Sequence, residues 1–158
     1  MATIVQETDI EASPQAVWAL LGDVRRLPEF SPSTERVDDA PPVLDRPGQT
    51  YTQVGRLFGK RYRSLWTVEE IDPGRRIRSR GVIGPGVSYV LTQDLAPTAV
   101  GCHLTITIDY RLPLGPLGRL ASKLGVAGRA STESAEVLAG LKRAAEIPAA
   151  ADPSPAGG

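Results

Sequence analysis

The side chains best suited to chemistry in this sequence are aromatic or neutral and polar, namely those of Tyr51, Gln53, Tyr62, Ser64, Trp66, Tyr89 and Tyr110. Their rings offer flat apolar surface, and their hydroxyl, indole and amide groups can orient a ligand by hydrogen bonding. General acid–base catalysis near neutral pH needs a group whose pKa lies near 7, and none of these side chains has one. The set therefore predicts binding of an apolar molecule in a cavity that contains no charged side chain.

Metal and cofactor chemistry find little support in the sequence. The chain has one histidine, His103, and one cysteine, Cys102, which cannot supply the usual four ligands of a zinc site. We expect His103 to be an exposed strand residue and Cys102 a small buried hydrophobe. The adjacent acidic pairs at 38–39 and 69–70 point their members to opposite faces of a strand, so neither forms a carboxylate dyad. We expect no metal and no cofactor.

The balance of charged residues bears on whether the protein binds nucleic acid or a membrane surface. The 158 residues carry 18 Lys plus Arg and 18 Asp plus Glu, so the net charge indicates neither nucleic-acid binding nor a membrane-surface patch. The first residues contain no apolar signal region, and no run is long enough to span a bilayer. A cytoplasmic protein without membrane insertion is the expectation.

The pattern of residues predicts an α+β fold of seven strands and three helices. Short connections containing glycine or proline leave no room for crossovers, so we expect the sheet to be antiparallel. A first strand precedes two short helices over 14–22 and 23–27, the second ending before Pro28. The seven strands are expected at residues 3–11, 33–37, 49–57, 60–71, 75–83, 87–95 and 102–112.

Alternation along these strands predicts one ligand-facing surface. In the hairpin of the fourth and fifth strands, Trp66 should lie opposite Gly81 and Glu70 opposite Ile77, and the arginines should occupy the other face. Trp66 either walls the cavity or fills the space above Gly81. The inward residues are predicted to be Tyr51, Gln53, Gly55, Tyr62, Ser64, Trp66, Ser79, Gly81, Val87, Tyr89, Leu91, Ile106, Ile108 and Tyr110.

A long amphipathic helix is predicted from about Pro116 to Ile147. Its sheet-facing residues, spaced by three and four, are expected to be Leu117, Leu120, Leu124, Ala127, Ser131, Ala135, Leu138 and Leu141. Small residues near Ala127 should leave space unfilled above the sheet, and Phe30 either covers the mouth of that cavity or anchors the short helices. Residues 1–147 should form one domain, and 148–158 a disordered tail rich in Ala, Pro and Gly.

Three segments carry a resemblance to a known group of proteins. Residues 11–18 (EASPQAVW), 27–30 (LPEF) and 68–76 (VEEIDPGRR), followed by the terminal amphipathic helix, resemble the SRPBCC superfamily, also called START-like or Bet v 1-like. The closest likeness is to its polyketide cyclase/dehydrase branch. This resemblance implies a helix-grip fold, in which a seven-stranded antiparallel sheet wraps around a long C-terminal helix above a deep apolar cavity.

Fold alone leaves several functions open. A carrier of a lipid-like or aromatic, polyketide-like small molecule is the first hypothesis. An aromatase/cyclase or dehydrase acting on a poly-keto chain is the alternative, with Tyr62 and Arg63 as candidate catalytic residues, because some such enzymes place an arginine in the pocket. Strand parity sets Arg63 opposite to Trp66, away from the cavity. A lesser alternative is an accessory factor like the G-type proteins of carbon monoxide dehydrogenase, with a protein partner that the residues do not identify.

Overall fold

The protein has the predicted α+β architecture. The computed structural model describes residues 2–57, 59–84, 86–111, 115–116, 119 and 125–147, without the side chains of 126 and 127. Leu117, Leu120, Leu124 and the expected tail over 148–158 lie outside this part of the chain. Within the described residues, no helix combines the length and the apolar character needed to cross a bilayer.

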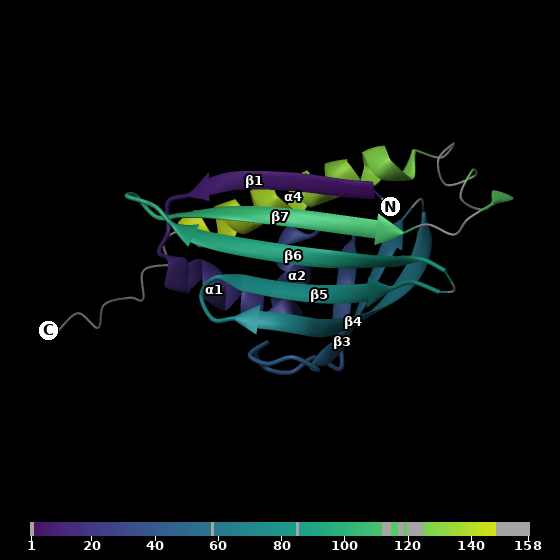
Figure 1. Cartoon of the computed structure of the whole chain (residues 1–158), viewed down its shortest axis with the longest axis horizontal. Helices are drawn as coiled ribbons and strands as arrows, with labels where there is room; N and C mark the ends of the chain where they lie inside the picture. The colour runs from purple at the N-terminus through teal and green to yellow at the C-terminus, as the bar shows by residue number, and fades with distance from the viewer. Residues whose placement is uncertain are drawn as a thin grey trace, which may run out of the picture.

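Seven antiparallel strands form a single sheet in the order β1-β7-β6-β5-β4-β3-β2 (Figure 1). The strands are β1 (Ala2–Ile10), β2 (Thr34–Asp38), β3 (Thr50–Leu57), β4 (Lys60–Asp72), β5 (Arg76–Val82), β6 (Ser88–Pro97) and β7 (Cys102–Arg111). The helices are α1 (Pro14–Gly22), the 3-10 helix η1 (Val24–Arg26), α2 (Leu27–Phe30) and α4 (Val126–Glu146). Consecutive strands from β2 to β7 are neighbours, whereas β1 pairs with β7 and so brings the N-terminus beside the last strand.

The register of the central hairpin follows the prediction at one end and departs from it at the other. Trp66 lies opposite Gly81, as predicted. A register shift just before Glu70 then places Glu70 opposite Arg78. The predicted pairing of Glu70 with Ile77 is wrong because a β-bulge adds one residue to β4 at this point. The half of the hairpin that carries Trp66 keeps the predicted facing.

The short helices begin at residues that suit helix N-termini. The Ser13 hydroxyl accepts a hydrogen bond from the Ala16 N–H at 3.1 Å, and Pro14 occupies the first turn of α1. The prediction that helical structure ends before Pro28 is wrong. Pro28 instead lies in the first turn of α2, where its missing N–H leaves no hydrogen bond unmade.

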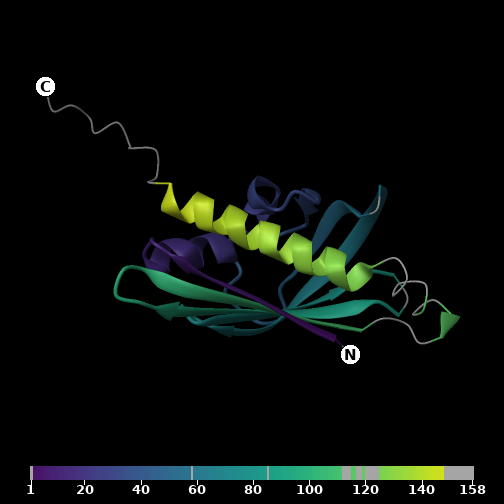
Figure 2. The same cartoon turned by 90° about the horizontal axis from the view of Figure 1, so that it is seen from above.

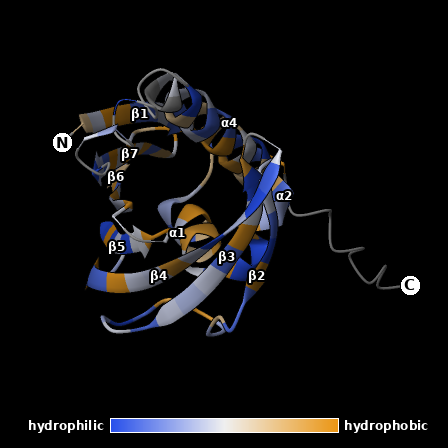
Figure 3. Ribbon diagram, turned by 90° about the vertical axis from the view of Figure 1, so that its right-hand side faces the viewer, coloured by the Kyte–Doolittle hydropathy of each residue, from blue (hydrophilic) through white to orange (hydrophobic). Residues whose placement is uncertain are grey.

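Helix α4 crosses the concave face of the sheet (Figure 2) and contacts β1, α1 and α2. The short helices α1 and α2 also lie on the concave side of the sheet, and α4 covers the rest of that side (Figure 3). Ser134, Leu138 and Leu141 are buried on α4, but Ala135, which we expected on this face, is exposed. The buried residues Ser134, Leu138 and Leu141 are spaced by four and three along the helix, so the neighbouring Ala135 points away from the sheet.

One glycine permits the close packing of α4 on α2. A Cβ placed on Gly140 would lie 2.6 Å from the carbonyl oxygen of Phe30 and 2.7 Å from its Cβ. These contacts are too short for any side chain, and the first involves backbone, which cannot rotate away. Gly128, on the same helix, would meet nothing within 4 Å. The two glycines therefore differ in tertiary packing while sharing the same helical backbone.

This difference generates a paired prediction. We expect Gly140→Ala to lower the free energy of unfolding by about 1–3 kcal/mol, because α4 must move away from α2. Gly128→Ala should raise it by up to about 1 kcal/mol, because alanine favours helix and has open space here. Urea denaturation of the two variants and the unchanged protein measures both effects. Equal shifts in the same direction would show that the contact with Phe30 does not limit the packing.

Candidate ligand-binding site

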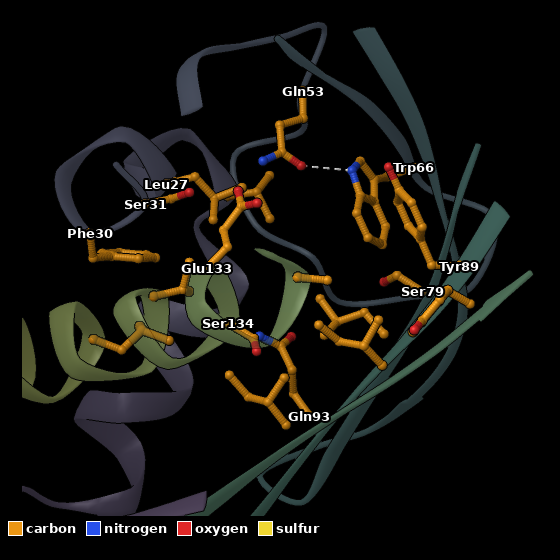
Figure 4. A pocket seen from close by; sticks show the side chains of 18 of the residues that line it. Leu27, Phe30, Ser31, Gln53, Trp66, Ser79, Tyr89, Gln93, Glu133 and Ser134 are labelled. Carbon is orange, nitrogen blue, oxygen red and sulfur yellow. Dashed lines mark hydrogen bonds between the residues drawn. The ribbon is translucent and has the colours of Figure 1, made fainter. Parts of the chain in front are cut away.

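A pocket lies between the concave face of the sheet, the short helices and α4 (Figure 4). Its lining residues come from α1, η1, α2, strands β3 to β7 and α4. The volume is about 280 Å³, just below the range of roughly 300–1,000 Å³ usual for small-molecule sites. Most of the lining side chains are aliphatic or aromatic, so the pocket suits a compact apolar ligand.

Three aromatic rings form a row on the sheet side of the pocket. The rings of Tyr51 and Trp66 are stacked, with centroids 6.2 Å apart and planes 9° apart. Tyr89 follows, with its centroid 5.5 Å from that of Trp66 and its plane tilted by 41°. A Cβ placed on Gly81 would come within 2.9 Å of the Trp66 ring and 2.8 Å of the Tyr89 ring. Gly81 thus lets both rings lie against the strand, and Trp66 both covers this glycine and lines the pocket.

A chain of neutral hydrogen bonds continues from the aromatic row. Trp66 Nε1 donates to Gln53 Oε1 at 2.9 Å (Figure 4). Gln53 Nε2 donates to Thr34 Oγ1 at 2.6 Å, and Thr34 Oγ1 lies 2.7 Å from Ser31 Oγ. Each polar group in this chain already has a partner, so the chain holds Trp66 and Gln53 in one orientation without leaving an unpaired buried donor or acceptor.

The pocket also contains a carboxyl group, which corrects the expectation of a cavity without charged side chains. Glu133, on α4, lines the pocket and accepts a hydrogen bond from the Ser33 hydroxyl. Burial raises the pKa of Glu133, and nearby Glu136 adds to the rise. Arg129, which also lines the pocket, opposes this rise. A carboxyl whose pKa is raised by burial inside a cavity is typical of functional sites.

Three tyrosines of the pocket carry phenols whose pKa is raised. Burial raises the pKa of Tyr51, Tyr62 and Tyr89, and the charge of Glu133 adds to the rise for Tyr62 and Tyr89. All three phenols therefore stay protonated at neutral pH. Tyr62, named above as a candidate catalytic residue, is a poor base for this reason.

The structure brings most of the predicted cavity residues together. Ser64 is fully buried next to the Tyr89 hydroxyl, and Gly81 lies beneath the rings, so larger neighbours separate both from the pocket. Leu120, Leu124 and the side chain of Ala127 lie outside the described part of the chain. The predicted residues that line the pocket are Phe30, Tyr51, Gln53, Tyr62, Trp66, Ser79, Val87, Tyr89, Leu91, Ile106, Ile108, Tyr110 and Leu141.

The arginines of the sheet lie on its outer face. The Arg63 guanidinium is 3.9 Å from an oxygen of Asp38 and its side chain is exposed, so it does not reach the pocket. Arg78 and Arg80 both pair with Glu69, at 3.3 and 2.6 Å. The β4 bulge lies beyond Arg63, so the alternation that directs this side chain outward is undisturbed.

His103 and Cys102 lie apart from the pocket. His103 Nδ1 is 2.7 Å from Asp9 Oδ1, and this hydrogen bond raises the pKa of the imidazole. Cys102 is buried, and burial raises the pKa of its thiol, which makes it unreactive at neutral pH. Among the residues that the structure describes, no group of three or more His, Cys, Asp or Glu is arranged to hold a metal ion.

Sequence reasoning predicted that the long helix covers the cavity but missed most of the helical residues that line it. On α4, a spacing of three and four residues links Ala130, Ser134, Val137 and Leu141, and Glu133 lies within that stripe. This spacing was the available signal. The missed helical residues include Leu20, Leu21, Val24, Leu27, Arg129, Ala130, Glu133, Ser134 and Val137.

Solved structures of low sequence identity share this fold. TTHA0849 from Thermus thermophilus has a TM-score of 0.75 and 24% identity, with coverage of 90% of this chain and 95% of that one. A START superfamily protein from Mycobacterium smegmatis has a TM-score of 0.69, 16% identity, and coverage of 90% and 97%. Ara h 8.0201 has a TM-score of 0.63, 12% identity, and coverage of 91% and 97%. At these identities the likeness shows the fold alone.

Comparison by sequence identifies the family. No curated protein matches this chain. The family model described as polyketide cyclase/dehydrase and lipid transport matches residues 1–146, from the first strand through the end of α4. This match confirms the likeness to the polyketide cyclase/dehydrase branch that was inferred from the sequence. The chain belongs to the polyketide cyclase/dehydrase and lipid transport family.

Proposed function

We propose that the protein binds a compact, ring-containing hydrophobic molecule in the pocket beneath α4 and acts as its carrier. The observation that carries this proposal is the row of Tyr51, Trp66 and Tyr89, whose rings face a cavity with otherwise mostly aliphatic walls. Flat rings stack favourably on one another in offset or tilted arrangements. Burying the apolar surface of a ligand here supplies most of the binding free energy.

The polar groups beside the aromatic row are compatible with an apolar ligand. The indole N–H of Trp66 and the amide of Gln53 are engaged within the protein, so an apolar ring placed beside them leaves no group unsatisfied. The family description, which includes lipid transport, agrees with a binding role. The pocket volume of about 280 Å³ favours a few fused rings over a long extended chain.

A pair of substitutions on α4 tests the carrier proposal. Ala130 lines the pocket, whereas Ala135 is exposed on the same helix. We expect Ala130→Phe to fill the cavity and weaken binding of the uncharged fluorophore N-phenylnaphthylamine by about tenfold or more, because the site loses the volume that the probe needs. Ala135→Phe adds the same side chain outside the pocket and should leave affinity unchanged. Equal affinity of both variants, measured by fluorescence titration, would place the probe elsewhere.

A second candidate function is proton transfer to or from a poly-keto chain, and Glu133 is the observation that favours it. A carboxyl whose pKa is raised toward neutrality can exchange a proton with a bound substrate. The protonated tyrosines would then stabilise a developing enolate oxygen by hydrogen bonding. This role assigns the acid–base step to Glu133 in place of Arg63 or Tyr62.

The raised pKa of Glu133 predicts a pH-dependent contribution to stability. Ionisation of this carboxyl is disfavoured in the folded protein, so its contribution is fully present below its ordinary pKa of 4.5 and is lost as pH rises through the raised value. We expect the free energy of unfolding to fall, relative to Glu133→Gln, as pH rises from 4.5 toward neutrality. Urea denaturation at a series of pH values measures the difference, in which other titrating groups cancel. Parallel curves for the two proteins would contradict the assignment.

A further inference from the structure

Glu133 is the one acidic side chain among the described residues that line the pocket. It projects from α4 into the pocket (Figure 4) and receives a hydrogen bond from Ser33, which lies between α2 and β2. A carboxyl has two oxygens with about four acceptor positions, so one serine hydroxyl leaves acceptor capacity for a ligand. The hydrogen bond between Ser33 and Glu133 connects α4 to the edge of the sheet. That connection alone does not require the Glu133 carboxyl to face the cavity.

Tyr62 lies beside the same group. A Cβ placed on Gly55 would lie 2.9 Å from the Tyr62 hydroxyl and would also overlap the Ser33 carbonyl oxygen. The absence of a side chain at Gly55 therefore brings the Tyr62 hydroxyl close to Ser33. The Tyr62 phenol also forms a side-chain hydrogen bond with Ser33, so the phenol, the Ser33 hydroxyl and the Glu133 carboxyl form one hydrogen-bonded group in the pocket wall.

We propose that Glu133, Ser33 and Tyr62 form a polar subsite that recognises a hydroxyl group on the ring-containing ligand and rejects ligands that carry a carboxylate. The inference rests on the carrier function proposed above. A hydroxyl group both donates and accepts, so it can donate to Glu133 while accepting from Tyr62. A site built to pair with a hydroxyl discriminates against analogues that lack it, because its own polar groups are then left unpaired.

Like charges explain the rejection of carboxylates. An ionised ligand placed against Glu133 would bring two negative groups together in a partly buried site, where their repulsion is less screened than in water. Arg129 lies on the same helix and favours the ionised form of Glu133. The charge of Glu133 in turn adds to the raised pKa of Tyr62 and Tyr89, which stay protonated. Ligand hydroxyls, in contrast, form charge-assisted hydrogen bonds with a carboxylate.

Four naphthalene probes of nearly equal size test the subsite by isothermal titration calorimetry at neutral pH. Naphthalene reports the apolar pocket alone, naphthol adds a donor, methoxynaphthalene carries an oxygen that cannot donate, and naphthoate carries a negative charge. We expect naphthol to bind about tenfold more tightly than methoxynaphthalene and at least about tenfold more tightly than naphthoate. Glu133→Gln should shrink the preference for naphthol over naphthoate by about tenfold while leaving naphthalene affinity unchanged.

Two further variants separate local recognition from general charge and folding effects. Glu70→Gln removes the same charge from an exposed position on β4, outside the pocket, and should leave the preference intact. Ser33→Ala removes the hydroxyl that holds Glu133 and should reduce the preference for naphthol in a protein that still binds naphthalene. Naphthol and naphthoate binding the unchanged protein equally, or an unchanged preference in Glu133→Gln, would overturn this inference. Failure of naphthalene itself to bind would overturn the carrier proposal as well.

Discussion

The pocket depends on how closely one helix can approach a curved sheet. An antiparallel sheet that twists and coils presents a concave apolar face, which must be covered. In its C-terminal half, α4 meets this demand by tight packing, with Leu138 and Leu141 in the core and Gly140 against the backbone of Phe30. Toward its N-terminus, Ala130 and Ser134 present small side chains to the same face, and the space they leave becomes the pocket.

The two faces of the sheet differ in charge. The outer faces of β2 to β5 carry arginines paired with Glu35, Asp38 and Glu69, where water screens their interactions and limits their effect on stability. The inner face holds rings, amides and hydroxyls. Glu133 departs from this pattern, because burying a carboxyl costs free energy that an apolar residue would avoid. A hydrogen bond from a ligand to Glu133 would offset this cost. A packing defect would give no reason for a carboxyl at this position.

The alternation of side chains along the strands correctly predicted which face of the sheet several site residues occupy. Alternation along β3, β4 and β6 placed Tyr51, Trp66 and Tyr89 on one face, and the structure stacks them there. The same rule set Arg63 on the opposite face, where it lies. The rule failed for Glu70, because a bulge changes the count of residues within a strand and no residue type in β4 announces it.

The sequence by itself determined the fold class, the antiparallel pairing of strands joined by short turns and the aromatic face, since these depend on turn residues and on a period of two along each strand. Only the tertiary structure decided the exact rotation of α4, because the side chains in the middle of the helix are small and define no strongly apolar stripe. Leu138 and Leu141 are buried as predicted, but the rotation buries Ser134 in place of Ala135. That rotation is set by the contact of Gly140 with Phe30, residues distant in the chain. It also places Glu133 in the pocket beside Ser33, so the chemistry of the site depends on packing between segments whose proximity no local pattern encodes.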